Sequence, residues 1–210
     1  MLLDHIESEP HKEYLEVIHR KTQSIERIID DLVIVDRLET GESLQVIPKE
    51  NDLSTTVNHM FKVYQMRFPD IMLHLELPEE PLVLLYDEIR IRQVIDNLLS
   101  NAVKYTNETR GTIDVSVVEQ ESKALIIIKD EGAGMNEDEL KQIYKKFFRA
   151  QAVKSIGGGL GLGMTIVKNI VDSHKGTIDI VSQRGFGTTV TVALPKSANS
   201  QPQIKLACNS

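Results

Sequence analysis

The spacing of apolar residues divides the chain into two parts. Between residues 10 and 41 they recur every three or four positions, a period that aligns them along one stripe of a long helix. These positions are Leu15, Ile18, Ile25, Ile29 and Leu32. Ser8-Glu9-Pro10 is typical of a helix start and Gly41 of a helix stop. Since one helix cannot bury such a stripe alone, we expect a partner helix; packing on its own domain is the alternative.

From residue 44 onward, short helical and strand patterns alternate. Asp52 is a good N-cap for a helix with Val57 and Phe61 on its apolar face, and a longer helix is predicted over residues 88–105. We expect two more helices over 137–146 and 161–174, and strands over 44–47, 71–77, 82–86, 112–119, 123–129, 177–182 and 188–194. This pattern predicts an α/β (α+β) sandwich over residues 42–195, a mixed sheet covered on one face by helices. The polar tail, 196–210, would be disordered.

Composition narrows the class of protein without identifying it. A hydrophobic fraction of 41% suits an ordinary folded core, and no apolar run approaches the length of a membrane span. The net charge of −7 argues against nucleic acid as a partner, because phosphate contacts need clustered Lys and Arg. The N-terminus lacks a signal-peptide pattern, and the single cysteine, Cys208, cannot form an internal disulfide. We therefore expect a cytoplasmic chain that does not itself contact a membrane.

The helix predicted over residues 88–105 carries polar side chains beside its apolar face. Three- and four-residue spacing aligns Asn97, Asn101, Lys104 and Tyr105. Asparagine is a poor helix former, so two of them inside a helix need a reason. An amide oxygen is a suitable Mg²⁺ ligand, and Lys104 offers a point charge to phosphate. On an arbitrary helix we would favour solvated asparagines and a surface lysine, but the glycine clusters downstream favour the ligand role.

Asp130 ends an apolar strand and is followed by two glycines. A carboxylate only accepts hydrogen bonds, so Asp130 suits an exocyclic amino group such as that of adenine, whereas guanine presents a carbonyl at that position. Gly132 and Gly134 allow backbone torsions and a close approach that a side chain would block. An ordinary strand-to-helix turn is the alternative for this motif taken alone.

A second glycine cluster, residues 157–163, leads directly into a predicted helix. Such glycines present free N–H groups and the positive end of the helix dipole to phosphates. The nucleotide-binding candidates here are Gly157, Gly159, Leu160, Gly161 and Leu162. A flexible linker is the alternative, which the apolar helix behind the cluster disfavours.

Aromatic residues beside an arginine lie between the two glycine clusters. Phe147, Phe148 and Arg149 suit a movable flap from which Arg149 reaches the terminal phosphate bidentately. The end of an amphipathic helix is nearly as good an interpretation of this segment.

Taken together, these motifs resemble the catalytic ATP-binding domain of bacterial sensor histidine kinases, a branch of the gyrase, Hsp90, histidine kinase and MutL superfamily. The matching segments are an asparagine box at 97–105, glycine boxes at 130–134 and 157–163, an aromatic box at 147–149, and a final Gly-x-Gly-Thr element at Gly185, Gly187 and Thr188. The resemblance covers residues 44–195 and implies a Bergerat-type ATP-binding fold that takes ATP or ADP with Mg²⁺.

The resemblance also implies a role for each matching residue. Asn101 would hold Mg²⁺ with help from Asn97, and Lys104, Tyr105 and Arg149 would contact phosphates. Asp130 would read adenine, and residues 135–158 would form the ATP lid. The remaining nucleotide contacts would come from Phe147, Phe148, Thr188 and the two glycine boxes.

Residues 10–41 resemble the second helix of the family's dimerisation and phosphoacceptor hairpin, and residues 1–9 the end of helix one with its loop. The family's acceptor histidine is usually followed by an acidic residue, and none of the six histidines here has that neighbour. We therefore expect residues 1–41 to be a partial hairpin without its own acceptor, belonging to a fragment or a naturally shortened form. Without helix one, its homodimer should be weak.

The leading hypothesis is a protein-histidine kinase module that moves the γ-phosphoryl of ATP to a histidine on a hairpin, for relay to the aspartate of a response regulator receiver domain. Two alternatives stay open. One is a non-catalytic regulatory fragment that binds ATP and pairs with a full kinase. The other is a serine kinase of the anti-sigma type, against which residues 10–41 argue.

Overall fold

The computed structural model describes residues 44–106, 111–148 and 160–196, together with scattered helical positions at 14, 15, 18, 22, 29 and 32–34. The strands are β1 (Lys49–Asp52), β2 (Met72–Glu76), β3 (Val83–Tyr86), β4 (Thr112–Glu119), β5 (Lys123–Asp130), β6 (Thr177–Gln183) and β7 (Gly187–Pro195). The helices are α2 (Leu53–Arg67), α3 (Glu88–Tyr105), α4 (Glu137–Leu140) and α5 (Gly163–Ser173). Among these described residues, no helix has the length and apolarity needed to cross a membrane.

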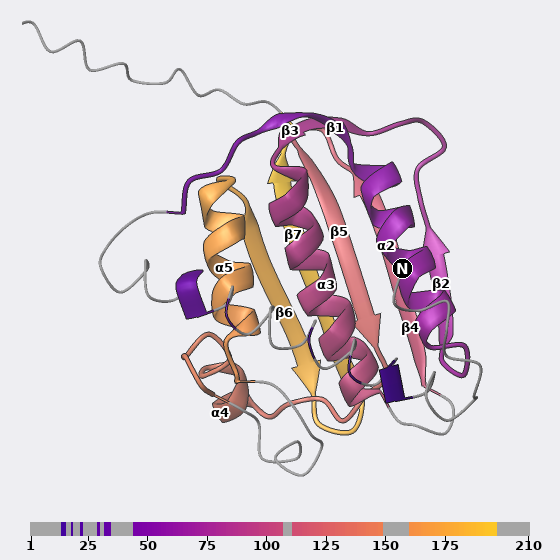
Figure 1. The fold of residues 1–210 in the computed structure, drawn as a ribbon, viewed down its shortest axis with the longest axis vertical. Helices are drawn as coiled ribbons and strands as arrows, with labels where there is room; N and C mark the ends of the chain where they lie inside the picture. The colour runs from indigo at the N-terminus through magenta and orange to yellow at the C-terminus, as the bar shows by residue number, and fades with distance from the viewer. Residues whose placement is uncertain are drawn as a thin grey trace, which may run out of the picture.

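Five strands form one mixed sheet in the order β2-β4-β5-β7-β6. β2 runs parallel to β4, and the other neighbours are antiparallel. β1 and β3 form a separate antiparallel pair. Helices α2, α3 and α5 lie side by side over one face of the five-stranded sheet (Figure 1). The predicted α/β sandwich with a mixed sheet is therefore confirmed.

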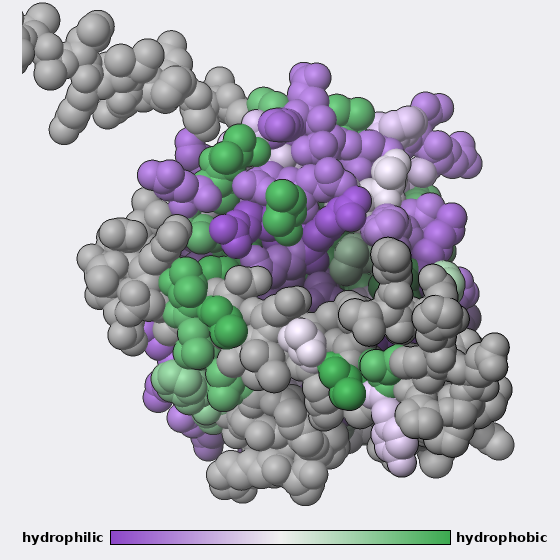
Figure 2. All heavy atoms as spheres, viewed as in Figure 1, coloured by the Kyte–Doolittle hydropathy of each residue, from purple (hydrophilic) through white to green (hydrophobic). Residues whose placement is uncertain are grey.

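The core lies between the helices and the inner face of the sheet. Alternate residues of the central strands point inward, so Val115 of β4 and Ile126 of β5 are buried while their sequence neighbours are less so. On α3, Ile91 and Ile95 are fully buried, as the apolar stripe predicts. On the solvent side, the surface around the starts of α2 and α3 is mainly hydrophilic (Figure 2).

Two aspartates fix where the longer helices begin. The side chain of Asp52 accepts a hydrogen bond from the Ser54 N–H at 3.0 Å, which confirms it as the α2 N-cap. Asp87 caps α3 in the same way, by accepting from the Arg90 N–H at 3.2 Å. Its other carboxylate oxygen accepts from the Ile47 N–H at 2.9 Å. Asp87 therefore joins the chain leading into β1 to the first turn of α3.

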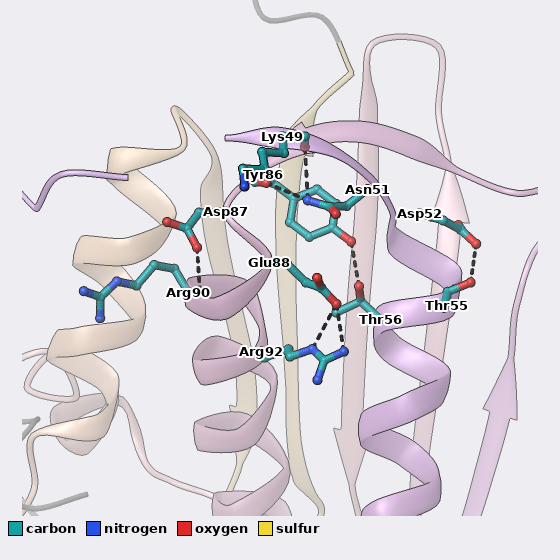
Figure 3. A network of polar contacts seen from close by, with 10 residues as sticks. All are labelled: Lys49, Asn51, Asp52, Thr55, Thr56, Tyr86, Asp87, Glu88, Arg90 and Arg92. Carbon is teal, nitrogen blue, oxygen red and sulfur yellow. Dashed lines mark hydrogen bonds and ion pairs between the residues drawn. The ribbon is translucent and has the colours of Figure 1, made fainter. Parts of the chain in front are cut away.

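The ends of α3 and α5 opposite the glycine motifs are held by buried polar contacts. The Asp87 N–H donates to His174 Nε2 at 3.0 Å. Because Nε2 accepts, Nδ1 carries the proton and donates to the Ile170 carbonyl at 2.8 Å. Burial lowers the pKa of His174, which keeps this imidazole neutral. In the neighbouring network, the hydroxyls of Tyr86 and Thr56 lie 2.7 Å apart (Figure 3).

Two element predictions were wrong. The helix expected over residues 137–146 ends at Leu140, because the following turns bond at three-residue spacing, with Gln142 N–H to Glu139 O and Lys145 N–H to Gln142 O. The strand expected over 44–47 is absent from that segment, whose Ile47 N–H bonds the side chain of Asp87 instead of a neighbouring strand. The first strand begins at Lys49.

The predicted N-terminal helix falls largely outside the described residues, as do its Gly41 stop and the tail after residue 196. Its described positions are helical. Ile18, Ile29 and Leu32 of the predicted stripe are exposed, with 60%, 54% and 43% of their surface accessible, whereas Ile34 is buried. The division of the chain at residues 41 and 195 stays a prediction.

Candidate functional site

The sequence motifs converge at one end of the domain, where the last turns of α3, the end of β5, the start of β7 and the start of α5 meet (Figure 1). Strand register brings two of these motifs together. Asp130, the last residue of β5, lies opposite Thr188 of β7. Residues 58 positions apart in sequence are thus neighbours on the sheet face that the helices cover.

Asp130 supplies a buried carboxylate. It is 7% exposed, and its Oδ1 accepts a hydrogen bond from the Gly132 N–H at 2.8 Å. Burial raises the pKa of Asp130 to about 6, although the backbone N–H groups of Gly132 and Thr188 act in the opposite direction. At neutral pH the group is therefore ionised but poorly solvated, which favours a ligand that donates a hydrogen bond to it.

The loop after Asp130 is pinned on two sides, and its glycines are required there. The Ala133 N–H donates to the Tyr105 carbonyl at 3.0 Å, and a Cβ on Gly132 would lie 2.2 Å from that same oxygen. Gly134 has φ +59°, and a Cβ there would lie 1.9 Å from the Gln183 carbonyl oxygen. The first glycine motif thus packs against both the end of α3 and the β6–β7 turn.

The polar stripe of α3 faces the start of α5. Asn97 is 6% exposed, and its Oδ1 would lie 3.1 Å from a Cβ placed on Gly163, the first residue of α5. Asn101, one turn later, is half-buried, as are Lys104 and Tyr105. The Lys104 Nζ lies 5.2 Å from the centre of the Tyr105 ring. The stripe therefore places the Asn97 amide beside the first residue of α5, and Asn101 and Lys104 follow it toward the end of α3.

The chemistry of these donors fits Mg²⁺ held together with phosphates. Within the described ranges, no three His, Cys, Asp or Glu side chains group as a metal site. One or two neutral amide oxygens suffice for Mg²⁺ when phosphates and water fill the remaining positions. Asn101 is the better candidate ligand because it is more accessible than Asn97.

The aromatic motif contacts the start of α5. The Phe147 N–H donates to the Gly161 carbonyl at 3.1 Å, and Phe147 itself has φ +63°, an uncommon conformation for a residue with a side chain. Gly161 has φ +73°, and a Cβ there would lie 2.6 Å from the Phe148 carbonyl oxygen. The Thr165 hydroxyl also donates to the Tyr144 carbonyl at 3.0 Å. Residues 144–148 are thus held to α5 by Thr165 and to the residue pair before α5 by Gly161.

The remaining candidates differ in burial. Leu162 is fully buried in the core, so it anchors α5, whereas Phe147 and Leu160 are 61% and 41% exposed. Arg149, Gly157 and Gly159 lie outside the described residues, so their predicted roles stay predictions.

Sequence reasoning missed Ser182. Its hydroxyl accepts a hydrogen bond from the Met135 N–H at 2.9 Å and lies 2.9 Å from the hydroxyl of Thr188. The available signal was alternation, because Ile178, Ile180 and Ser182 occupy inward positions on β6, and a polar residue at the third of these is unusual.

Comparison with known proteins shows which family the chain belongs to. The family described as histidine kinase-, DNA gyrase B-, and HSP90-like ATPase matches residues 86–198. The chain is 34% identical to the circadian input-output histidine kinase CikA of Synechococcus elongatus, over 93% of this chain and 26% of CikA. It is 32% identical to the sensor protein SrrB of Staphylococcus aureus, over 93% of this chain and 34% of SrrB. The chain thus spans 26% to 34% of the length of these relatives.

The fold is also that of solved kinase domains. The catalytic domain of histidine kinase ThkA superposes with a TM-score of 0.63 at 26% identity, covering 71% of this chain and 96% of that one. ThkA solved in complex with response regulator protein TrrA gives a TM-score of 0.67 at 22% identity, covering 94% of this chain and 55% of that one. The chain belongs to the histidine kinase-, DNA gyrase B- and HSP90-like ATPase family and carries an ATP-binding domain of the histidine kinase type.

Proposed function

We propose that this chain binds Mg-ATP and transfers its γ-phosphoryl group to a histidine on a helical hairpin, from which a response regulator aspartate would receive it. One observation carries the proposal. A buried hydrogen-bond acceptor, Asp130, and a glycine-led helix N-terminus, Gly161 to Gly163, lie at the same end of the domain as the amide and ammonium groups of α3. The amino group of a purine base needs the hydrogen-bond acceptor, and a chain of phosphates needs the helix N-terminus and the ammonium group, so a nucleotide requires both side by side.

Each of these residues would contact a different part of the nucleotide. Asp130 would accept the amino group of adenine, and the N–H groups at the start of α5 would face phosphate oxygens. Asn101, with help from Asn97, would hold Mg²⁺, and Lys104 would add a positive charge. When bound, Mg²⁺ neutralises the charge of the β- and γ-phosphates. Tyr105 and Arg149 are proposed as further phosphate contacts, and Phe147 and Phe148 as part of the lid that covers them.

The transfer itself requires mainly positioning. A bond forms between an imidazole nitrogen and the γ-phosphorus while the bond from that phosphorus to the bridging oxygen breaks, leaving ADP. Lys104, a half-buried residue of the α3 stripe, would stabilise the charge on the transferred group. The acceptor imidazole would come from a hairpin supplied in the same chain, a partner chain or a longer form of this protein.

The proposal is tested by incubating the protein with Mg²⁺ and γ-labelled ATP, alone and with an added hairpin that carries a histidine-acidic acceptor pair. We expect label on the hairpin, and its loss in Asn101→Ala. Asn58→Ala is the matched control, because Asn58 is a half-buried asparagine inside α2, away from the site. ATP binding without label on either protein would favour a regulatory module. Absence of ATP binding would overturn the proposal.

We further propose that the N-terminal helix pairs with a second copy. Ile18, Ile29 and Leu32 are exposed apolar positions on the predicted stripe, and burying them requires a partner surface. A monomeric mass by sedimentation equilibrium at high protein concentration, with this helix folded, would contradict the pairing.

A further inference from the structure

The backbone of Phe147 adopts a conformation that favours glycine. Phe147 has φ +63° and is the third residue of the turn Lys145–Phe148, which the Phe148 N–H closes by donating to the Lys145 carbonyl at 3.1 Å. A turn with positive φ at its third residue usually has glycine or asparagine there, because a Cβ strains this conformation. Of the non-glycine residues that the structure describes, only Lys175, with φ +57°, shares a positive φ. Such strain persists only where neighbouring contacts hold it.

The contact that holds Phe147 is with Gly161. The Phe147 N–H donates to the Gly161 carbonyl at 3.1 Å, and a Cβ on Gly161 would lie 2.8 Å from the carbonyl carbon of Phe147. The Phe147 side chain is 61% exposed, so its burial contributes little to this contact, which we call the clasp. One hydrogen bond contributes about as much free energy as a left-handed backbone costs a residue with a Cβ. The formed and open states of the clasp are therefore close in free energy.

The clasp also orients the peptide that leads into α5. The Gly161–Leu162 peptide is trans, so its carbonyl and its N–H point in opposite directions. Because the carbonyl is turned to Phe147, the Leu162 N–H faces away from the aromatic motif. Leu162 is the N-cap of α5 and makes no side-chain cap hydrogen bond, so no side chain at this position fixes the peptide. The clasp supplies the fixed point instead.

We propose that Phe147 is a positioning residue for ATP binding that acts through its main chain. The clasp sets the Gly161–Leu162 peptide, and with it the direction of the N–H groups that would face phosphate oxygens at the start of α5. This inference rests on the proposed nucleotide site. ATP then binds to molecules in which the clasp is formed, and its apparent affinity falls in proportion to the fraction in which the clasp is open.

Two substitutions at one position separate the main chain of Phe147 from its ring. Phe147→Gly and Phe147→Ala both remove the ring, but only glycine adopts a φ of +63° without strain. In calorimetric titrations with Mg²⁺ present, we expect Phe147→Gly to bind ATP about 3- to 10-fold more tightly than Phe147→Ala, because more molecules have the clasp formed. Equal affinities would overturn the inference. Tighter binding by Phe147→Ala would also overturn it, since ATP would then require the open state.

Hydrogen exchange at the amide of residue 147 reports the clasp directly. Saturation of the wild type with a non-hydrolysable ATP analogue should slow this exchange, because the nucleotide selects molecules with the clasp formed. Without nucleotide, exchange at this amide should be slower in Phe147→Gly than in Phe147→Ala. Unchanged or faster exchange in the saturated wild type would contradict the positioning role.

Lys175 provides a matched control at the other end of α5. Lys175→Gly and Lys175→Ala also exchange a strained backbone for an unstrained one, at a residue just after the helix ends. The glycine variant should have the higher free energy of unfolding, while both variants bind ATP equally. If their ATP affinities differ as those of the Phe147 pair do, glycine acts through general stability and the inference is overturned. If the wild type binds no ATP, the proposed function itself fails.

Discussion

Replacing Asp130 by asparagine should stabilise the nucleotide-free protein while it weakens ATP binding. Burial raises the pKa of this carboxyl from 3.8 to about 6. The folded protein therefore keeps the proton over a pH range in which the unfolded chain has already lost it. The free energy of unfolding falls as pH rises through that range, and above pH 6 the whole cost of the buried charge is present.

The size of the effect follows from the shift. A difference of one in pKa corresponds to about 1.4 kcal/mol, so the rise from 3.8 to about 6 means that ionised Asp130 lowers the free energy of unfolding by about 3 kcal/mol. Asparagine removes that charge and keeps an oxygen for the Gly132 N–H, but its buried NH₂ group needs a partner, at a cost of about 1–3 kcal/mol. We expect a net gain of about 1 kcal/mol at pH 7.5.

Urea unfolding at pH 5 and pH 7.5, without nucleotide, measures this difference. From pH 5 to pH 7.5 the free energy of unfolding of the wild type should fall by roughly 1–1.5 kcal/mol more than that of Asp130→Asn. The reason is that at pH 5 the Asp130 carboxyl still holds its proton in most folded molecules. Asp114→Asn is the matched control, since Asp114 is a half-exposed carboxylate on the other face of the sheet, 3.9 Å from the Lys129 Nζ. Equal pH slopes for the wild type and Asp130→Asn would refute the reasoning.

Binding should change in the opposite direction to stability. A hydrogen bond to a charged acceptor is worth about 1.5–3 kcal/mol, so Asp130→Asn should weaken ATP by roughly 10- to 100-fold. Its amide NH₂ can donate to the guanine carbonyl, so the preference for ATP over GTP should narrow. Calorimetric titration with both nucleotides measures each change. Unchanged ATP affinity would remove Asp130 from adenine recognition.

Two further predictions concern the ends of α5. Gly161→Ala should weaken nucleotide binding in a titration, because its φ of +73° and the 2.6 Å approach to the Phe148 carbonyl force residues 147–148 away; unaltered affinity would show that this contact is dispensable. The lowered pKa of His174 predicts that stability is lost as pH falls below 6.5, where the unfolded chain takes up a proton that the buried imidazole refuses. His174→Gln in the Asp130→Asn background should flatten that slope in urea unfolding, and an unchanged slope would contradict the assignment.

How much could be predicted from the sequence depended on how local the determining contacts are. The bounds of α3 matched the prediction because its apolar stripe and the Asp87 cap are encoded within one segment. The helix predicted over 137–146 was too long because the chain after Leu140 continues in turns of three-residue spacing, and one of these turns is held by the hydroxyl of Thr165, 21 residues away, which donates to the Tyr144 carbonyl. Such a contact leaves no periodic trace in the sequence.

The residues of the candidate site also divide into those set by local sequence and those set by distant contacts. Asn97, Asn101 and Asp130 were identifiable because each sits in a short motif whose chemistry is unusual for its element. Ser182 was not, because its partner Met135 is 47 residues away and strand register alone brings Ser182 to Thr188. Alternation marks Ser182 only as a polar residue at an inward position, so its partners are revealed only by the paired sheet.

The hydrogen bonds of Asp87 have a mechanical consequence. One carboxylate oxygen holds the Ile47 N–H, the other holds the first turn of α3, and the backbone N–H holds His174 just after α5. Helices transmit displacement nearly as rigid rods, and the 18 residues of α3 extend over about 27 Å from this point to the nucleotide end. A displacement of the chain at Ile47 would therefore act on its bond to Asp87, on the β1–β3 pair that begins two residues later, and on the first turn of α3. Through Asp87, tension on the segment before β1 would reach α3 as a change of tilt, and this tilt would move the far end of α3, where we propose that phosphates bind.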